Sequence, residues 1–273
     1  MKDHSDWKLY RNALVPRVSH IDPDVSVIRS GVLWKEYPKA LFIKYTTDFD
    51  CEEQTNWWYV VKDEPMDVGK LNAKRRYEIT KGSRNFEVRR ICPVEYHAEM
   101  FRVTQATYNT YPSKYRPNLT EGSFAKKISD WSNFEVYGGF SRENQILCAY
   151  AMLRKNGNWA DFCVLCADPA YEKKAVNAAM VYGILNANDE FLRNGGYICD
   201  GNRTIRHESA FQEYLEKYFG FRKAYCKLHI VFRPGIGIAV KVLYPARKLL
   251  KKLNHIGFVH NVNSVLDMKN YAN

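Results

Sequence analysis

The 273-residue sequence lacks an apolar run long enough to cross a membrane. A spanning helix needs roughly 18 or more consecutive apolar residues, and no stretch of this chain reaches that length. The first residues, MKDHSDWKLYRN, are charged and lack the apolar core of a secretory signal. These absences exclude a spanning helix and a secretory leader within the sequence, and they predict a cytoplasmic protein.

A disulfide framework and a paired-cysteine metal site are also missing. The seven cysteines are odd in number and scattered through strand-like segments, which suits free thiols in a reducing compartment. Cys163 and Cys166 have the spacing of half a zinc knuckle, but they lie in the strand pattern WADFCVLCADP, where residues three apart point to opposite faces. No second pair follows at zinc spacing, so the sequence predicts no metal site. Internal repeats and low-complexity linkers are absent as well.

Acidic residues are scarce in two parts of the chain. The net charge is +11 and the isoelectric point is about 9.2. Residues 217–266 contain ten Lys and Arg but no Asp or Glu, and residues 70–90 contain eight Lys and Arg against two Glu. This imbalance predicts an anionic partner. A nucleic acid, an anionic membrane surface and a phosphorylated ligand all fit. A solvated helix face remains an alternative explanation for 70–90.

Patterns of hydrophobicity predict a mixed α/β chain. The first third is read as mostly strand, because 40–47 and 56–62 are rich in aromatic and β-branched residues. Helices are expected at 67–82, closed by Gly82, at 93–108 and at 121–131. We divide the chain into a β-rich N-terminal extension (1–66), a central domain (67–235) and a basic amphipathic C-terminal tail (236–273).

The order of elements after Phe134 is more specific. A strand at NFEVYGGFS comes first, followed by two strands joined by the Asn-Gly turn at 156–158. A long helix at 170–196, a short strand at 197–200, a helix at 209–219 and a final strand then complete the order. The predicted order is β-β-β-α-β-α-β, which gives a mixed sheet flanked by helices. The crossover helix requires strands 159–166 and 197–200 to be adjacent and parallel.

The loop between strand 197–200 and the next helix concentrates polar residues. Asp200, Arg203, Arg206 and His207 lie at the carboxyl end of a strand and just before a helix, where ligands and anions gather in α/β sheets. Ser209 is suited to cap the helix, with Gln212 as its capping-box partner. We therefore predict that Arg203 and His207 line a pocket at this edge of the sheet.

Three stretches together resemble the GNAT acyltransferase fold, and within it the FemAB-like branch. They are LNAKRRYEITKGSRNFEVRRI (71–91), ADPAYEKKAVNAAMVYGIL (167–185) and GGYICDGNRTIRHESAFQEYLEKYFGFRKAY (195–225), and the likeness runs from about Trp57 to Pro234. GNAT acetyltransferases begin the long helix with a glycine-rich turn that holds the coenzyme A pyrophosphate. The corresponding PAYEKKAVNAAM has no glycine, as is common among FemAB-like proteins. The resemblance therefore leaves three possible acyl donors, which are acyl-CoA, aminoacyl-tRNA and another carrier.

The resemblance implies that donor and acceptor meet where strands 159–166 and 197–200 splay apart. Asp200 and His207 are the candidate bases for the amine or hydroxyl nucleophile, and the backbone N–H groups of Cys166 and Ala167 are the candidate oxyanion donors. The candidate substrate-binding side chains are Arg203, Asp168, Tyr171, Asn177 and Gln212. For Asp168 a strand-ending turn is the competing interpretation, and for Asp200 a structural cap.

The function that this resemblance implies is acyl or aminoacyl transfer to an amine or hydroxyl of a cell-envelope polysaccharide or lipid-linked precursor. No covalently bound cofactor is implied, and acyl-CoA or aminoacyl-tRNA would be a donor substrate. Two alternatives stay open: a non-catalytic GNAT-like domain that binds an acidic glycan precursor or a protein, and a basic RNA-binding protein. A helix at 246–253, with leucines on one face and Lys and Arg on the other, predicts peripheral contact with the inner face of an anionic membrane. Docking of this helix on the protein's own core is the alternative.

Overall fold

A computed structural model describes most of the chain as two compact units. The described residues are 6–10, 12–111, 113, 116–131, 133–203, 210–247, 250, 252, 257–268 and 271–272. Unit 1 contains 1–59, 202–209 and 223–273, and unit 2 contains 60–201 and 210–222. The chain therefore passes between the units several times, and this division does not follow the three consecutive segments defined from the sequence.

Unit 1 combines the N-terminal residues with the C-terminal ones. Its sheet pairs β2 with β1 (antiparallel) and with β3 (parallel), and β3 antiparallel with β10, from Lys227 opposite Thr47 to Phe232 opposite Phe42. Its elements are β1 Trp7–Tyr10, β2 Ala13–Pro16, α1 Val25–Arg29, α2 Val32–Glu36, β3 Phe42–Thr47, the first half of β4 Trp57–Lys62, most of β10 Arg222–Phe232, α9 Pro234–Leu243 and α11 Gly257–Met268. The reading of the first third as mostly strand was incomplete, because α1 and α2 also lie there.

The core of unit 1 explains why those two short helices form. Asp24 caps α1 by accepting a hydrogen bond from the Ser26 N–H, and Gly31 adopts φ +72° to turn the chain into α2. Both helices then bury one apolar side chain each against the strands. The cluster comprises Trp7, Leu14, Ile28, Leu33, Ala40, Ile43 and Tyr45.

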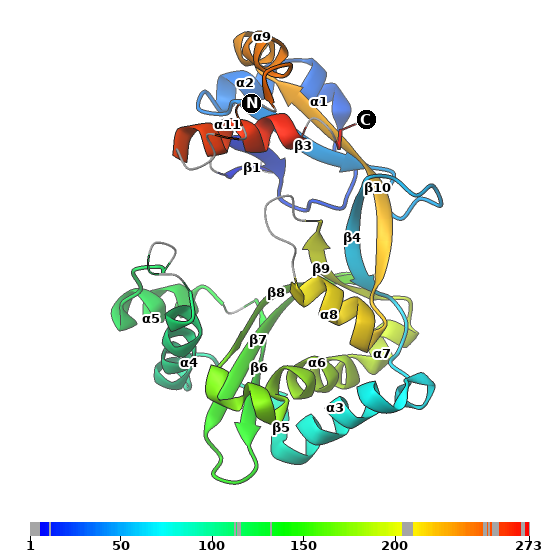
Figure 1. Cartoon of the computed structure of the whole chain (residues 1–273), viewed down its shortest axis with the longest axis vertical. Coiled ribbons are helices and arrows are strands. Elements are labelled where there is room, and N and C mark those ends of the chain that lie inside the picture. The colour runs from blue at the N-terminus through cyan, green and yellow to red at the C-terminus, as the bar shows by residue number, and fades with distance from the viewer. Residues whose placement is uncertain are drawn as a thin grey trace. The chain divides into compact units, whose positions relative to one another are not determined.

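Unit 2 contains a mixed sheet with helices on both faces (Figure 1). Its strands pair in the order β5-β6-β7-β8-β9, with α4 packed on β7 and β8 and with α6 packed on β5, β6 and β7. The elements are α3 Ala73–Asn85, β5 Phe86–Arg90, α4 His97–Asn109, α5 Glu121–Ser129, β6 Glu135–Ser141, β7 Leu147–Asn156, β8 Trp159–Ala167, α6 Val176–Ala187, α7 Asp189–Arg193, β9 Tyr197–Asn202 and α8 Ala210–Phe219, with 3₁₀ turns at Val68–Lys70 and Pro169–Lys174.

The order of elements predicted after Phe134 is confirmed. Strands β6, β7 and β8 form an antiparallel meander, and β9 pairs parallel with β8 through Trp159–Tyr197, Ala160–Ile198 and Asp161–Cys199. Gly157 at the hairpin and Gly220 after α8 both have positive φ, as their predicted turn positions require. The chain thus has the predicted mixed α/β fold.

The single long helix predicted at 170–196 was wrong. Ala175 has φ +66° and separates a 3₁₀ turn from α6, and α6 ends at Asn188 before α7 begins. The Asn188 side chain donates to the Ile184 carbonyl (2.8 Å) and to the Tyr137 hydroxyl (3.2 Å). Apolar periodicity alone does not reveal these interruptions, because it continues through both breaks.

Gly82 does not terminate α3 as predicted, because the helix continues to Asn85. Its lack of a side chain serves close packing of α3 on α6. A Cβ at this position would lie 2.7 Å from the Ala175 carbonyl oxygen and 2.8 Å from the Ala179 nitrogen. Because both obstacles are backbone atoms, the two helices can approach this closely only at a glycine.

Replacing Gly82 by Ala is expected to lower the free energy of unfolding by about 1–3 kcal/mol, since the added methyl overpacks a helix interface. Gly122 in α5 is the matched control, because a Cβ there meets no atom within 4 Å. Gly122→Ala should stabilise the protein by up to about 1 kcal/mol through helix propensity. Urea denaturation of both variants measures the difference, and a neutral Gly82→Ala would contradict the close packing.

The C-terminal region begins with α9 Pro234–Leu243, which the sequence analysis did not anticipate. The helix predicted at 246–253 lies mainly outside the described residues, which exclude 248, 249, 251 and 253. Among the described residues, no helix is long and apolar enough to cross a membrane.

Candidate functional site

The candidate site lies where β8 and β9 stop pairing. Their parallel register covers Trp159–Asp161 and Tyr197–Cys199, and β8 then continues to Ala167 without β9. The pairing of β8 with β7 skips Cys163, because Met152 faces Val164 while Leu153 faces Phe162. This extra residue is a β-bulge, which bends a strand and leaves backbone groups outside the ladder.

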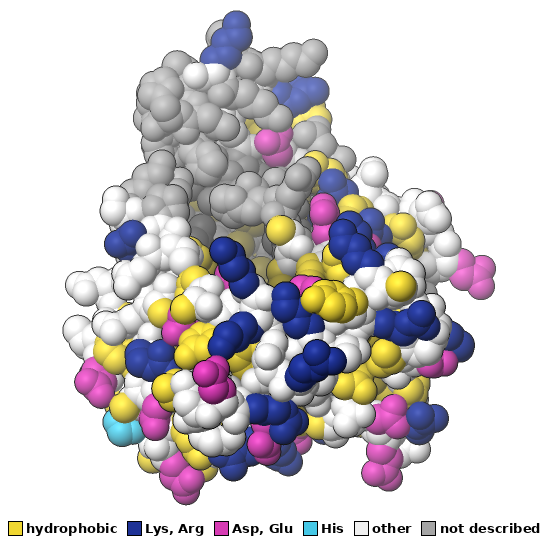
Figure 2. All heavy atoms as spheres, turned by 60° about the horizontal axis from the view of Figure 1, so that its bottom comes forward, with side chains coloured by type: hydrophobic (Ala, Val, Ile, Leu, Met, Phe, Trp, Pro, Cys, Tyr) yellow, Lys and Arg dark blue, Asp and Glu magenta, His cyan; other side chains and the backbone are white. Residues whose placement is uncertain are grey.

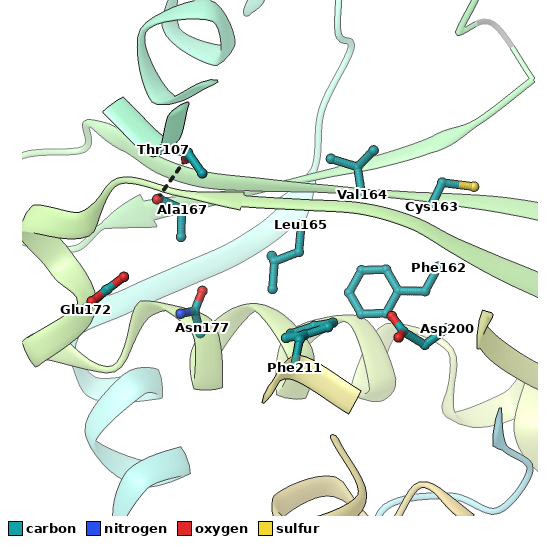
Figure 3. Close-up of a pocket in the computed structure, with 10 residues that line it drawn as sticks. All are labelled: Thr107, Phe162, Cys163, Val164, Leu165, Ala167, Glu172, Asn177, Asp200 and Phe211. Atoms are coloured by element: carbon teal, nitrogen blue, oxygen red, sulfur yellow. Dashed lines mark hydrogen bonds between the residues drawn. The ribbon is translucent and has the colours of Figure 1, made fainter. Parts of the chain in front are cut away.

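A pocket of about 420 Å³ opens directly beside the bulge (Figure 3). Asp200 from β9 lies near Phe162 and Phe211 at one end, and Glu172 and Asn177 lie toward the other end. The rings of Phe162 and Phe211 meet edge to face with centroids 6.0 Å apart. The full lining is Thr107, Phe162, Cys163, Val164, Leu165, Ala167, Glu172, Asn177, Asp200 and Phe211.

The Asp200 carboxyl group is the most perturbed acid of the site. Burial raises its pKa from the usual 3.8 to about 7, and a hydrogen bond from the Gln212 side chain opposes that rise. Gln212 is itself buried on α8. A carboxylate with this pKa exchanges its proton near neutral pH, which is the property required of a general base or acid.

Gln212→Leu is expected to raise the pKa of Asp200 further, because the variant removes the hydrogen bond that favours the ionised carboxylate while leaving the site buried. Carboxyl ¹³C chemical shifts followed against pH measure this pKa. Glu213→Leu on the next position of α8, which lies outside the pocket lining, is the control. An unchanged pKa in Gln212→Leu would mean that the amide does not stabilise the carboxylate.

Asp168 and Tyr171 lie at the turn after β8 and do not line the pocket. Asp168 accepts a hydrogen bond from Arg102 Nη1 (3.1 Å) and another from the Ala170 N–H (3.1 Å), so it caps the 3₁₀ turn and pairs with α4. Tyr171 packs edge to face on Phe86 at 6.0 Å. These contacts fit the structural interpretation of Asp168, and the substrate-binding roles of both residues stay predictions.

The candidate oxyanion donors fall at the end of β8. Cys166 is buried and faces Tyr150 across the ladder, while Ala167 lines the pocket and its carbonyl accepts from the Thr107 hydroxyl at 3.0 Å. Cys163, the residue inserted at the bulge, and Val164 beside it also line the pocket. No sequence pattern predicted the bulge, because an inserted residue does not alter strand composition.

Arg203 belongs to unit 1, whereas Asp168, Asn177 and Asp200 belong to unit 2. Its guanidinium lies 4.4 Å from the Trp58 ring centroid and 4.5 Å from that of Tyr271, and its Nη1 donates to the Asn56 carbonyl at 2.8 Å. These contacts fix the arginine within unit 1. The predicted pocket partner His207 lies outside the described residues, as do Arg206 and Ser209.

Sequence reasoning placed Asp200 and Asn177 in the site but missed Thr107, Phe162, Glu172 and Phe211. Phe211 belongs to the apolar stripe of α8, so its periodicity indicated core packing. Thr107 comes from α4, more than fifty residues before β8. No local pattern marks such residues, because the fold alone brings them together.

Comparison with known proteins gives matches at the level of structure. No family model matches this sequence, and no curated protein matches it. L-PGS from Bacillus licheniformis aligns over 83% of this chain and 79% of its own at 11% identity, with TM-score 0.53. A conserved protein of unknown function from Bacteroides thetaiotaomicron covers 81% and 79% at 12% identity, with TM-score 0.56.

A third match is the C-terminal domain of a putative lysylphosphatidylglycerol synthetase from Agrobacterium fabrum. It covers 87% of this chain and 84% of its own at 10% identity, with TM-score 0.52. At such identities the likeness concerns the fold. The chain therefore shares the fold of these proteins, a GNAT-like mixed sheet flanked by helices, as its sequence predicted.

Proposed function

We propose that unit 2 is the catalytic part of an acyl- or aminoacyltransferase in which Asp200 is the general base. The observation that carries this proposal is a carboxyl group of pKa about 7 in a pocket at the divergence of two parallel strands. In α/β sheets, ligands bind at the carboxyl ends of strands. The bulge at Cys163 adds backbone groups at the same wall.

The proposed reaction begins when the amine or hydroxyl of the acceptor attacks the acyl carbonyl carbon. Asp200 takes the proton that the nucleophile loses, and backbone N–H groups around Cys163 and Val164 stabilise the negative charge on the carbonyl oxygen. The bond from the carbonyl carbon to the donor oxygen or sulfur then breaks. The leaving group receives the proton, so the carboxylate of Asp200 is regenerated.

The polar lining favours a substrate that carries an amino group. Glu172 and Asp200 contribute two carboxyl groups, and the ten lining residues include no Lys or Arg. A pyrophosphate would find no cationic partner in this lining, whereas a protonated amine would be attracted by Glu172. Together with the structural likeness to a protein named lysylphosphatidylglycerol synthetase, this supports an aminoacyl donor and an envelope lipid or lipid-linked acceptor.

Helix α3 and strand β5 offer a surface for the RNA part of such a donor. Lys74, Arg76 and Arg84 on α3 are exposed, as are Arg89 and Arg90 on β5. Figure 2 brings this side of unit 2 forward, and Lys and Arg side chains are spread across it. Phosphate contacts of this kind are independent of sequence and weaken with salt. Charged tRNA is a cytoplasmic donor, so the proposal locates the protein in the cytoplasm.

The experiment is a transfer assay with purified protein, a pool of radiolabelled aminoacyl-tRNAs and vesicles containing phosphatidylglycerol, with acetyl-CoA in a parallel arm. Label in the lipid fraction supports aminoacyl transfer to lipid, and label only from acetyl-CoA would assign a thioester donor. A soluble amine or sugar acceptor replaces the vesicles in a second series. If no arm yields product while tRNA still binds, the protein is a binding domain and the catalytic proposal is wrong.

A further inference from the structure

Helix α9 (Figure 1) belongs to unit 1, and the arginine just before it binds that unit. Arg233 donates from Nε to the Ala40 carbonyl (2.9 Å) and from Nη2 to the carbonyls of Trp34 (3.1 Å) and Tyr37 (3.0 Å). Its backbone N–H also donates to the Leu41 carbonyl at 3.0 Å. These four bonds hold the first turn of α9 against α2 and the segment that joins α2 to β3.

The outward side of α9 is apolar and uncovered. Ile238 is 67% exposed, Val242 70% and Leu243 37%, whereas Val240 is the buried residue of the helix. Gly235 and Ala239 are exposed as well. These five residues recur at i, i+3, i+4, i+7 and i+8, which places them on one continuous face of the helix. We call it the outer α9 face.

Large apolar side chains exposed together on one helix face indicate a binding surface, whereas scattered ones are ordinary. In unit 2, by contrast, the exposed apolar residues Val94 and Ile146 come singly from loops. We therefore expect the outer α9 face to bind a partner that presents apolar groups.

The charge around α9 selects among possible occupants. Lys241 is exposed beside the outer α9 face, and residues 233–247, which run through α9, contain Arg233, Lys241 and Arg247 but no Asp or Glu. A second copy of the same face would bring like charges together. An anionic lipid surface satisfies both features, because its headgroups attract the cations and its acyl boundary accepts the apolar face. The helix is too short to span a bilayer, so it would lie in the surface plane.

We propose that α9 is an interfacial membrane-binding helix that inserts Ile238, Val242 and Leu243 into the boundary of an anionic bilayer. Arg233 keeps the helix in a fixed orientation on unit 1, so the protein is ready to bind without first ordering this segment. The inference stands apart from catalysis, since it rests on the surface of unit 1 and not on the pocket of unit 2.

Vesicle co-sedimentation tests the proposal with the full chain. Wild-type protein should pellet with vesicles of phosphatidylcholine and phosphatidylglycerol, pellet weakly with phosphatidylcholine alone, and detach as salt rises. The double variant Ile238→Ser/Val242→Ser should lower the partition coefficient roughly tenfold or more. Lys241→Glu should weaken binding to the anionic vesicles specifically. Val94→Ser, at an equally exposed valine of unit 2, is the matched control and should bind like wild type.

Circular dichroism first verifies that the variants fold, which is expected because both substituted side chains are exposed. Equal partition of wild type and the double variant would overturn the proposal, as would failure of wild type to bind anionic vesicles at low salt. A wild-type dimer in analytical ultracentrifugation that the double variant abolishes, without vesicle binding, would assign the outer α9 face to a second copy instead.

Discussion

Replacing Asp200 by Asn is expected to lower kcat for acyl transfer by about 10²–10⁴-fold, the usual contribution of a positioned general base. The amide has nearly the shape of the carboxyl group but cannot take a proton from the nucleophile. In the wild type, kcat should rise with pH and reach half its plateau near the pKa of about 7. The transfer assay described above, run across pH, measures both effects.

Although Asp200→Asn is expected to lower kcat, it is expected to raise the stability of the folded protein. Because burial raises the pKa of Asp200 from 3.8 to about 7, the folded protein binds more protons than the unfolded chain between these values, so stability falls as pH rises through this range. Asp200→Asn removes the buried charge and should stabilise the protein above pH 7 by about 1–3 kcal/mol.

Asp189→Asn is the control for Asp200→Asn. Asp189 is an exposed acid of α7 that pairs with Arg193, and its replacement should change neither kcat nor the pH profile. If Asp200→Asn has the kcat of the wild type, Asp200 is not the general base. Loss of turnover together with loss of stability would instead assign Asp200 a structural role.

Lys44→Met is expected to raise the free energy of unfolding at neutral pH by up to about 3 kcal/mol. Lys44 lies on β3 with its Nζ 4.4 Å from the centroid of the Trp57 ring, and burial lowers its pKa from 10.5 to about 8, with a smaller opposing influence of Cys226. The difference between these pKa values corresponds to roughly 3 kcal/mol. The cation–π contact offsets part of this cost, so the figure is an upper value.

The pH dependence of stability separates this explanation from a simple gain of apolar packing. Between pH 8 and 10.5 the unfolded chain keeps the Lys44 proton that the folded protein has lost, so wild-type stability should rise across this window. Lys44→Met should lack that rise. Lys39→Met, at an exposed lysine of the same unit, should stay within about 0.5 kcal/mol of wild type. Urea denaturation at several pH values gives the result, and a destabilised Lys44→Met would contradict it.

Local patterns were sufficient for much of unit 2. The Asn-Gly hairpin, the parallel pairing of 159–161 with 197–199 and the end of α8 at Gly220 all follow from residues that are close in sequence. The candidate base Asp200 was found because a strand end before a helix is a common ligand site. Such features depend on turn chemistry and periodicity, which a single sequence displays.

Features that depend on distant contacts were not predictable. Gly82 looked like a helix terminator, because its role depends on the backbone of Ala175 on another element. Arg203 stays a predicted ligand-binding residue, but its contacts with Asn56, Trp58 and Tyr271 were not foreseen, because those residues are far away in sequence. Helix α9 was missed because its two glycines and Pro234 resemble a loop, whereas the bonds of Arg233 to the α2–β3 segment hold its first turn in place.

The pairing of β3 with β10 has a consequence for biosynthesis. Phe42 emerges from the ribosome early, but its ladder partner Phe232 follows only after all of unit 2 has been made. Strands β5 to β8, by contrast, are neighbours in sequence and can pair during translation. Because domains fold as units and distant pairings close slowly, unit 2 should fold first. Until β10 has been made, the edge of β3 that pairs with it has no partner strand. That interval is when nascent chains would be most prone to aggregate and most dependent on chaperones.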